Sequence, residues 1–63
     1  MTKRPSYIWI GLTFMFNGIY CEVIKMYNKH FEFKMQERDG RHYMSYDFYK
    51  TTPSFFGRQL NKR

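Results

Sequence analysis

The chain has 63 residues, which is room for one small domain and excludes a multi-step enzyme with separate cofactor and substrate units. It carries 11 Lys and Arg against 5 Asp and Glu, a formal net charge of +6, and 22% of its residues are aromatic. Alanine is absent, while Phe, Tyr and Ile, which fit a half-buried sheet, are abundant. The composition therefore favours a β-rich fold with a surface that attracts acidic partners.

Two turn signals, Asn17-Gly18 and Asp39-Gly40, divide the chain into segments, because such dipeptides adopt the positive φ angles that tight hairpins need. Reading outward from them predicts a single domain, residues 1–63, that is mostly β: a four-stranded antiparallel meander. The four predicted strands are residues 7–16, 19–27, 31–36 and 41–50.

The remaining tail, residues 51–63, is predicted to be a short C-terminal helix or an irregular segment. Thr52 and Pro53 are typical of the N-cap and the first position of a helix. The alternative is a small α+β fold in which residues 7–16 and 19–29 are helical, since their apolar residues also recur at rough helical spacing.

The predicted loop lengths determine which side chains share a face of the sheet. Loops of two residues at 17–18, three at 28–30 and four at 37–40 collect the apolar side chains on one face, since opposed residues point to the same side. Only Lys25 and His42 interrupt this face. Its interaction residues are predicted to be Phe14, Phe31, Phe33, Met44 and Phe48.

This apolar face is too large for the short tail to cover. We therefore expect it to meet a second copy of the chain in a homodimer, a partner protein, or the sheet itself curled into a barrel. The loop at 28–30 is the sensitive point of the register. A loop of two residues there would turn the third strand over and bring Glu32 and Lys34 to the core.

The opposite face mixes aromatic and basic side chains, a combination that stacks bases and neutralises phosphates in single-strand binders. Glu22, Glu32 and Asp47 are expected on this face too and would repel phosphates, which favours an ordinary solvated surface instead. The candidate contacts for nucleic acid or an acidic protein surface, including those of the basic tail, are Trp9, Lys34, Arg38, Arg41, Tyr43, Tyr49, Arg58, Lys62 and Arg63.

Groups for catalysis or metal binding are few. Cys21 is predicted to face the core, where a thiol is inert, and with His30 and His42 it matches no standard zinc spacing. His30 is expected opposite Asp47, a pairing more typical of an ordinary surface than of proton transfer. We therefore predict no enzymatic activity, no metal and no cofactor.

The chain has one cysteine, and a lone thiol fits the reducing conditions of the cytoplasm, which is the predicted location.

Two functional hypotheses follow. The first is a small basic binding module that binds nucleic acid or is associated with it as an accessory protein. The alternative is a phage or mobile-element protein that inhibits a host protein through the apolar face or an edge strand, because the alanine-free composition fits an AT-rich coding sequence. A membrane role is disfavoured, since the apolar run at 7–16 is half of the roughly 20 residues that a spanning helix needs.

Overall fold

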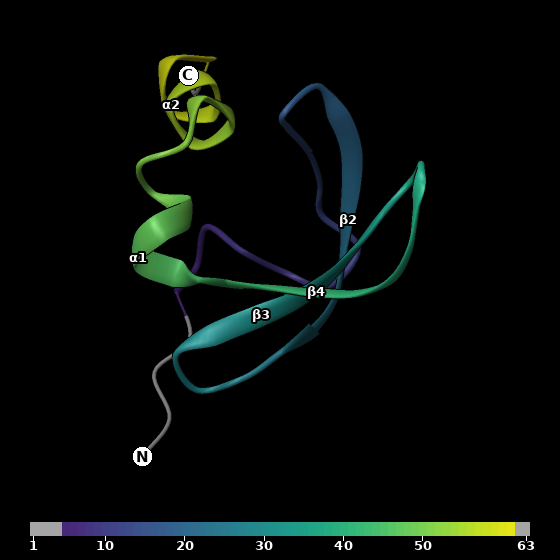
Figure 1. Ribbon diagram of the computed structural model, residues 1–63. Coiled ribbons are helices and arrows are strands. Elements are labelled where there is room, and N and C mark those ends of the chain that lie inside the picture. The colour runs from purple at the N-terminus through teal and green to yellow at the C-terminus, as the bar shows by residue number, and fades with distance from the viewer. Residues whose placement is uncertain (1–4, 62–63) are drawn as a thin grey trace.

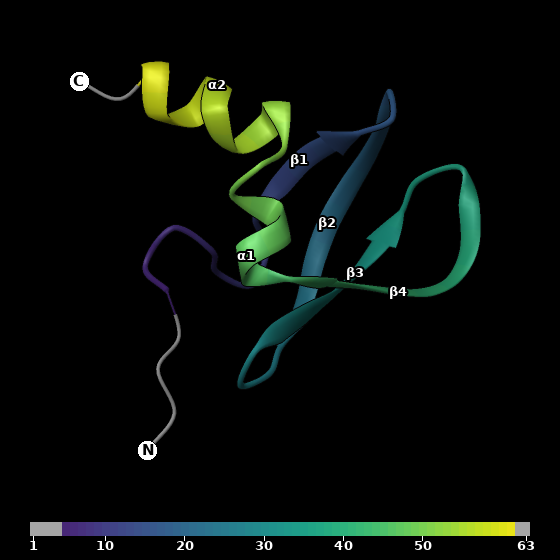
Figure 2. The same ribbon diagram turned by 60° about the vertical axis from the view of Figure 1, so that its left-hand side comes forward.

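The computed structural model describes residues 5–61, with side chains as far as Arg58, and shows a four-stranded antiparallel sheet followed by two short helices. The sheet order is β1-β2-β3-β4, so the predicted meander with a short helical tail is confirmed. Both helices lie on the same side of the sheet (Figures 1 and 2). The elements are β1 (Thr13–Phe16), β2 (Ile19–Met26), β3 (His30–Met35), β4 (Arg38–Ser45), α1 (Tyr46–Tyr49) and α2 (Pro53–Asn61).

The first strand is shorter than predicted, because residues 7–12 do not form a regular strand. Gly11 has a φ of 97°, which glycine adopts without steric cost, and the Leu12 N–H donates to the Trp9 carbonyl at 3.0 Å. Gly11 and Leu12 remain hydrogen-bonded to the Val23 backbone at 2.8 and 2.9 Å. This turn leaves Ile10 exposed while Leu12 is buried in the core.

The fourth strand ends at Ser45, and residues 46–49, predicted as strand, form α1. Ser45 is the N-cap: its hydroxyl accepts the Phe48 N–H at 3.0 Å, which satisfies one of the free donors of the helix. The predictions for two residues were therefore wrong. Tyr49, expected on the outer face, is fully buried, and Phe48, expected on the apolar face, is exposed.

A β-bulge at Ile24 removes Lys25 from the core face. The loop between β2 and β3 has two residues rather than three, since the Tyr27 N–H donates to the His30 carbonyl at 2.8 Å. The register shift between Val23 and Lys25 adds one residue to β2 and so keeps β3 from turning over. As a result Met26, not Lys25, packs against the core, and Tyr27 was wrongly predicted to face inward.

The reversal between β3 and β4 lies at residues 36–37, not at Asp39-Gly40 as predicted. Gly40, with a φ of 92°, instead belongs to a second irregularity, after which Phe33 opposes His42 rather than Met44. The register therefore differs from the prediction by two residues. Because side chains alternate with a period of two, the inward-facing residues are unchanged.

The chain itself covers the inner face of the sheet. Tyr49 lies with its ring centroid 5.3 Å from that of Phe14, 5.7 Å from that of Phe31 and 5.8 Å from that of Phe55 on α2. The residues that form the core are Ile8, Leu12, Phe14, Cys21, Val23, Phe31, Phe33, Met44, Tyr46 and Tyr49.

The expectation that this apolar face is open to a second copy or a partner is therefore wrong. Tyr46 and Tyr49 of α1, with Ile8 of the N-terminal segment, are buried in the same cluster as the sheet residues. The four predicted interaction residues that are buried instead are Phe14, Phe31, Phe33 and Met44.

Truncating a ring of the core tests this assignment. We expect Phe31→Ala to lower the free energy of unfolding by about 3–5 kcal/mol, because it leaves a cavity among four other rings. The control is Phe56→Ala on the exposed side of α2, which we expect to cost less than about 0.5 kcal/mol. Urea unfolding followed by circular dichroism measures both values, and equal losses would contradict the assignment.

The assignment of Ile24 as the added residue of β2 can be tested by deletion. Deleting Ile24 converts β2 to regular alternation without moving Val23 or Met26 to the other face, so the fold is expected to survive. The midpoint of thermal unfolding should fall by less than about 8 °C, the upper shift that 1 kcal/mol gives in a small domain. Deleting Glu32 on β3 should abolish folding, because it places Phe31 and Phe33 on opposite faces. Loss of folding in both variants would show that Ile24 is not the added residue.

Candidate nucleic-acid interface

The face of the sheet opposite the core carries a compact group of rings and charges, which we call the outer cluster. Its members come from neighbouring strands, since Lys25 opposes Glu32 and Glu32 opposes Tyr43. They are Lys25, Tyr27, His30, Glu32, Arg41 and Tyr43.

Glu32 is the centre of the outer cluster and is only 5% exposed. The Tyr27 hydroxyl donates to its Oε1 at 3.0 Å, and the Arg41 Nε lies 3.4 Å from its Oε2. A buried carboxylate is tolerated only when it is hydrogen-bonded and paired, and here both oxygens have a partner. The negative charge of Glu32 is therefore compensated within the cluster.

Three rings of the outer cluster lie beside this carboxylate. Tyr27 and His30 are stacked, with centroids 4.7 Å apart and an interplanar angle of 20°. The ring of Tyr43 lies 5.8 Å from that of His30 and 6.3 Å from that of Tyr27. The Lys25 Nζ is 5.4 Å from the Tyr27 centroid, a cation–π distance. The result is an aromatic patch bordered by cations.

Of the three carboxylates expected to repel phosphates, Glu22 and Glu32 lie on the outer face as predicted, and Asp47 does not. Glu22 lies 3.9 Å from the Nζ of Lys34, its neighbour across the ladder, so its charge is also paired. Asp47 is on α1 and not on the sheet, and His30 opposes Ser45 instead. The main argument from the sequence against this face is thereby weakened.

The structure brings together only some of the predicted contact residues. Lys34, Arg41 and Tyr43 share the outer face. Trp9 is exposed but precedes β1, and Arg38 is at the exposed beginning of β4. Tyr49 is buried and offers no ring for stacking. Two further predictions, Lys62 and Arg63, lie outside the described residues.

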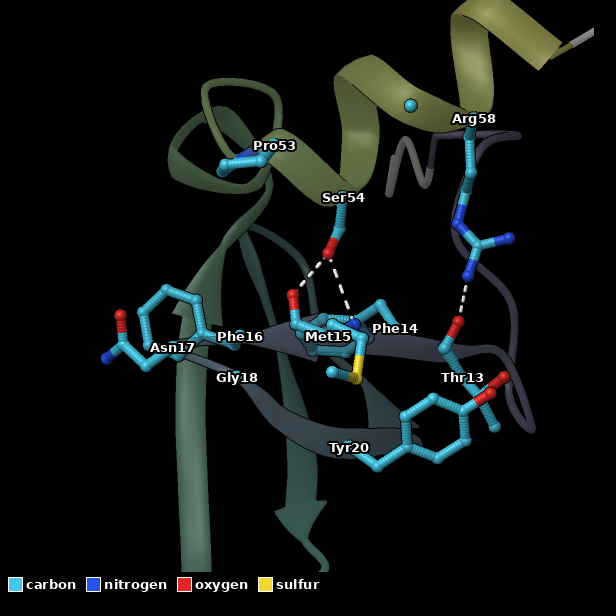
Figure 3. A pocket seen from close by; sticks show the side chains of 11 residues that line it. Thr13, Phe14, Met15, Phe16, Asn17, Gly18, Tyr20, Pro53, Ser54 and Arg58 are labelled. Atoms are coloured by element: carbon cyan, nitrogen blue, oxygen red, sulfur yellow. Dashed lines mark hydrogen bonds between the residues drawn. The ribbon is translucent and has the colours of Figure 1, made fainter.

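Arg58, predicted to contact a partner, is bound to its own chain. Its Nε donates to the Tyr49 hydroxyl at 3.3 Å, and its Nη2 donates to the Thr13 carbonyl (Figure 3). The Ser54 hydroxyl accepts the Met15 N–H at 3.1 Å and donates to the Met15 carbonyl. Helix α2 therefore satisfies backbone groups on the free edge of β1, a common protection of edge strands.

The sequence pattern placed two members of the outer cluster, Lys25 and Tyr27, on the inner face. The bulge at Ile24 turns both side chains to the outer face, and the interruption of the predicted apolar face by Lys25 was the signal for it. His30 was expected on the outer face, where it lies, but not as a contact residue. The hydrogen bond between Ser54 and Met15 at the edge of β1 joins residues that are 39 apart in sequence, and no sequence motif indicates it.

The remaining candidate groups, Cys21 and His42, contact other parts of the chain. Burial raises the pKa of the Cys21 thiol, and its Sγ–H donates to the Ile19 carbonyl at 3.3 Å, so this group stays a protonated thiol. The ring of His42 stacks on Phe33 at 5.6 Å. Within residues 5–61 no three His, Cys, Asp or Glu side chains are grouped so that they could hold a metal.

Comparisons of the chain with protein-family models, with curated proteins and with solved structures give no significant match. In the part of the chain that the structure describes, neither helix is long and apolar enough to cross a membrane. The geometry of the outer cluster is therefore the basis on which a function is inferred.

The contact between Tyr27 and Glu32 gives a prediction for pH dependence. The pKa of Tyr27 is raised above its ordinary value of 10.0, first by the hydrogen bond to Glu32 and then by burial. Because the folded-state pKa is the higher one, this contribution to stability is complete below about pH 10 and is lost as the pH rises through the pKa of Tyr27. We expect Glu32→Gln to lower that pKa, since a neutral amide accepts a weaker bond and does not repel phenolate.

Titration of the tyrosine ring carbons by NMR measures this pKa in each variant. The matched control is Glu37→Gln in the exposed turn between β3 and β4, which should leave the pKa of Tyr27 unchanged. An unchanged value in Glu32→Gln would contradict the hydrogen bond.

Proposed function

We propose that the protein is a small, basic, non-enzymatic module that binds nucleic acid as an accessory protein. The observation that carries the proposal is the outer cluster, where the exposed ring of Tyr43 and two half-buried rings lie beside cations and the nearby carboxylates are paired. Phosphate contacts need cations, and contacts to bases use ring faces and hydrogen-bonding edges. Lys34, Arg41 and Tyr43 supply these groups on one face.

The distribution of charge along the chain supports the same function. All five acidic residues lie within residues 5–61, whereas four of the 11 basic residues, Lys3, Arg4, Lys62 and Arg63, lie at the two ends of the sequence. Most of the net positive charge is therefore at the ends. Short basic ends of this kind bind phosphates without regard to base sequence and strengthen binding at a neighbouring site.

The alternative function, inhibition of a host protein, now depends on the edge of β4. The apolar face is covered, and Ser54 and Arg58 occupy the edge of β1. Directly after β4 the Tyr46 N–H donates to the Lys29 carbonyl. Because hydrogen-bonded pairs alternate along an antiparallel ladder, the backbone groups of Tyr43 and Ser45 then point away from β3. An extended segment of another protein would pair there. Either function fits the cytoplasm, of the source cell or of an infected host.

Salt dependence tests the proposed function. If about five phosphates are contacted, affinity for a labelled oligonucleotide should fall about 100-fold between 50 and 200 mM salt, because binding releases counterions. Fluorescence polarisation measures this change. Binding that is insensitive to salt, or no binding at micromolar protein, would remove the proposal.

Charge variants locate the contacts. Lys34→Gln should weaken binding and reduce the salt slope by about 1, since it removes a phosphate contact and frees Glu22. The matched control is Lys50→Gln, which removes the same charge directly after α1, on the opposite side of the molecule. Equal effects of the two substitutions would show that the outer face is not the binding surface.

A further inference from the structure

We infer that the outer cluster selects single-stranded nucleic acid by stacking an unpaired base on Tyr43. This inference depends on the proposed function. It adds the class of nucleic acid that is bound and the residue that contacts the unpaired base. Base pairing and stacking in a duplex cover the faces of its bases, so an exposed protein ring gains a partner only from an unpaired base.

Tyr43 is the ring best placed for such a contact. Its side chain is 56% exposed on β4, although the rings of His30 and Tyr27 lie 5.8 and 6.3 Å away. The His30 ring meets it at 74°, an edge-to-face arrangement, so Tyr43 has a ring contact and is still more than half exposed. A supported ring loses less conformational entropy on binding than a free one.

Two cationic side chains, those of Arg41 and Lys25, lie on the same face of the sheet as the Tyr43 ring. Arg41 is two residues away on β4, about 7 Å along the strand, and its side chain is 75% exposed although its Nε contacts Glu32. The guanidinium carries five N–H donors, so its remaining groups are free to meet a phosphate oxygen. Lys25, held over Tyr27, adds a second cation on the same face.

The matched aromatic position is Tyr20. It lies on β2 opposite Met15, on the same side of the sheet, and is 54% exposed. No ring contact to Tyr20 is among those found in the described residues, and its ladder partner is apolar. The two tyrosines thus have the same exposure but differ in their surroundings.

The experiment compares Tyr43→Leu and Tyr20→Leu for binding to a single-stranded oligonucleotide and to the duplex of the same sequence. We expect the wild-type protein to prefer the single strand. Tyr43→Leu should lose about 5- to 150-fold in affinity for the single strand, the range for one stacked base, and little for the duplex. Tyr20→Leu should change neither affinity by more than about twofold.

The outcomes separate this inference from the proposed function. Equal losses for the two variants, or a duplex bound as tightly as the single strand, would overturn the stacking site while nucleic-acid binding stands. No binding of either nucleic acid removes both. A readout without substitution is photocrosslinking with a bromouracil-containing single strand. A crosslink at Tyr43 supports the inference, and crosslinks confined to other residues overturn it.

Discussion

The buried ring of Tyr49 is the contact on which the rest of the structure depends. It joins β1, β3 and α2 through its contacts with Phe14, Phe31 and Phe55, and its hydroxyl accepts a hydrogen bond from Arg58. Burying an aromatic side chain contributes about 1.5–3 kcal/mol before entropic costs. The whole net stability expected for 63 residues is about 3–9 kcal/mol. The apolar inner face of the sheet is therefore covered within the chain because α1 supplies this ring.

Closing the inner face determines which surfaces are left for binding. The helical turn that buries Tyr49 also takes Asp47 away from the sheet, and α2 places Ser54 and Arg58 along the edge of β1. The outer face then keeps its cations, while Glu32 is shielded by Tyr27 and Arg41. The same packing that stabilises the domain thus leaves one aromatic and basic surface exposed.

The sequence was sufficient for the parts of the fold that follow from regular alternation. The turn at Asn17-Gly18 predicted that Phe14 opposes Cys21, and the period of two predicted Phe31 and Phe33 on the inner face. The bulge at Ile24 was indicated only by Lys25, which interrupts the predicted apolar face, because Ile24 and Met26 are apolar and fit either phase of the alternation. Residues 46–49 were read as a continuation of the strand, whereas the cap at Ser45 begins a helical turn there that buries Tyr46 and Tyr49, three residues apart.

The same limits apply to the candidate site. Arg41 and Tyr43 were predicted correctly because a register difference of two residues leaves each side chain on the same face, and Lys34 because the face of β3 survives the compensated shift. Lys25 and Tyr27 were placed on the wrong face, since the bulge at Ile24 turns both side chains outward. The burial of Glu32 arises from side chains of two other segments, and no local pattern encodes it.

The most direct test of the account is the environment of the Tyr49 ring in solution. Nuclear Overhauser effects from a selectively labelled Tyr49 ring report which protons lie within contact distance. The account predicts cross-peaks to the rings of both Phe14 and Phe31, which belong to strands separated by β2. A Tyr49 ring without either cross-peak and accessible to solvent would contradict it, and would return the inner face of the sheet to the surface of the protein.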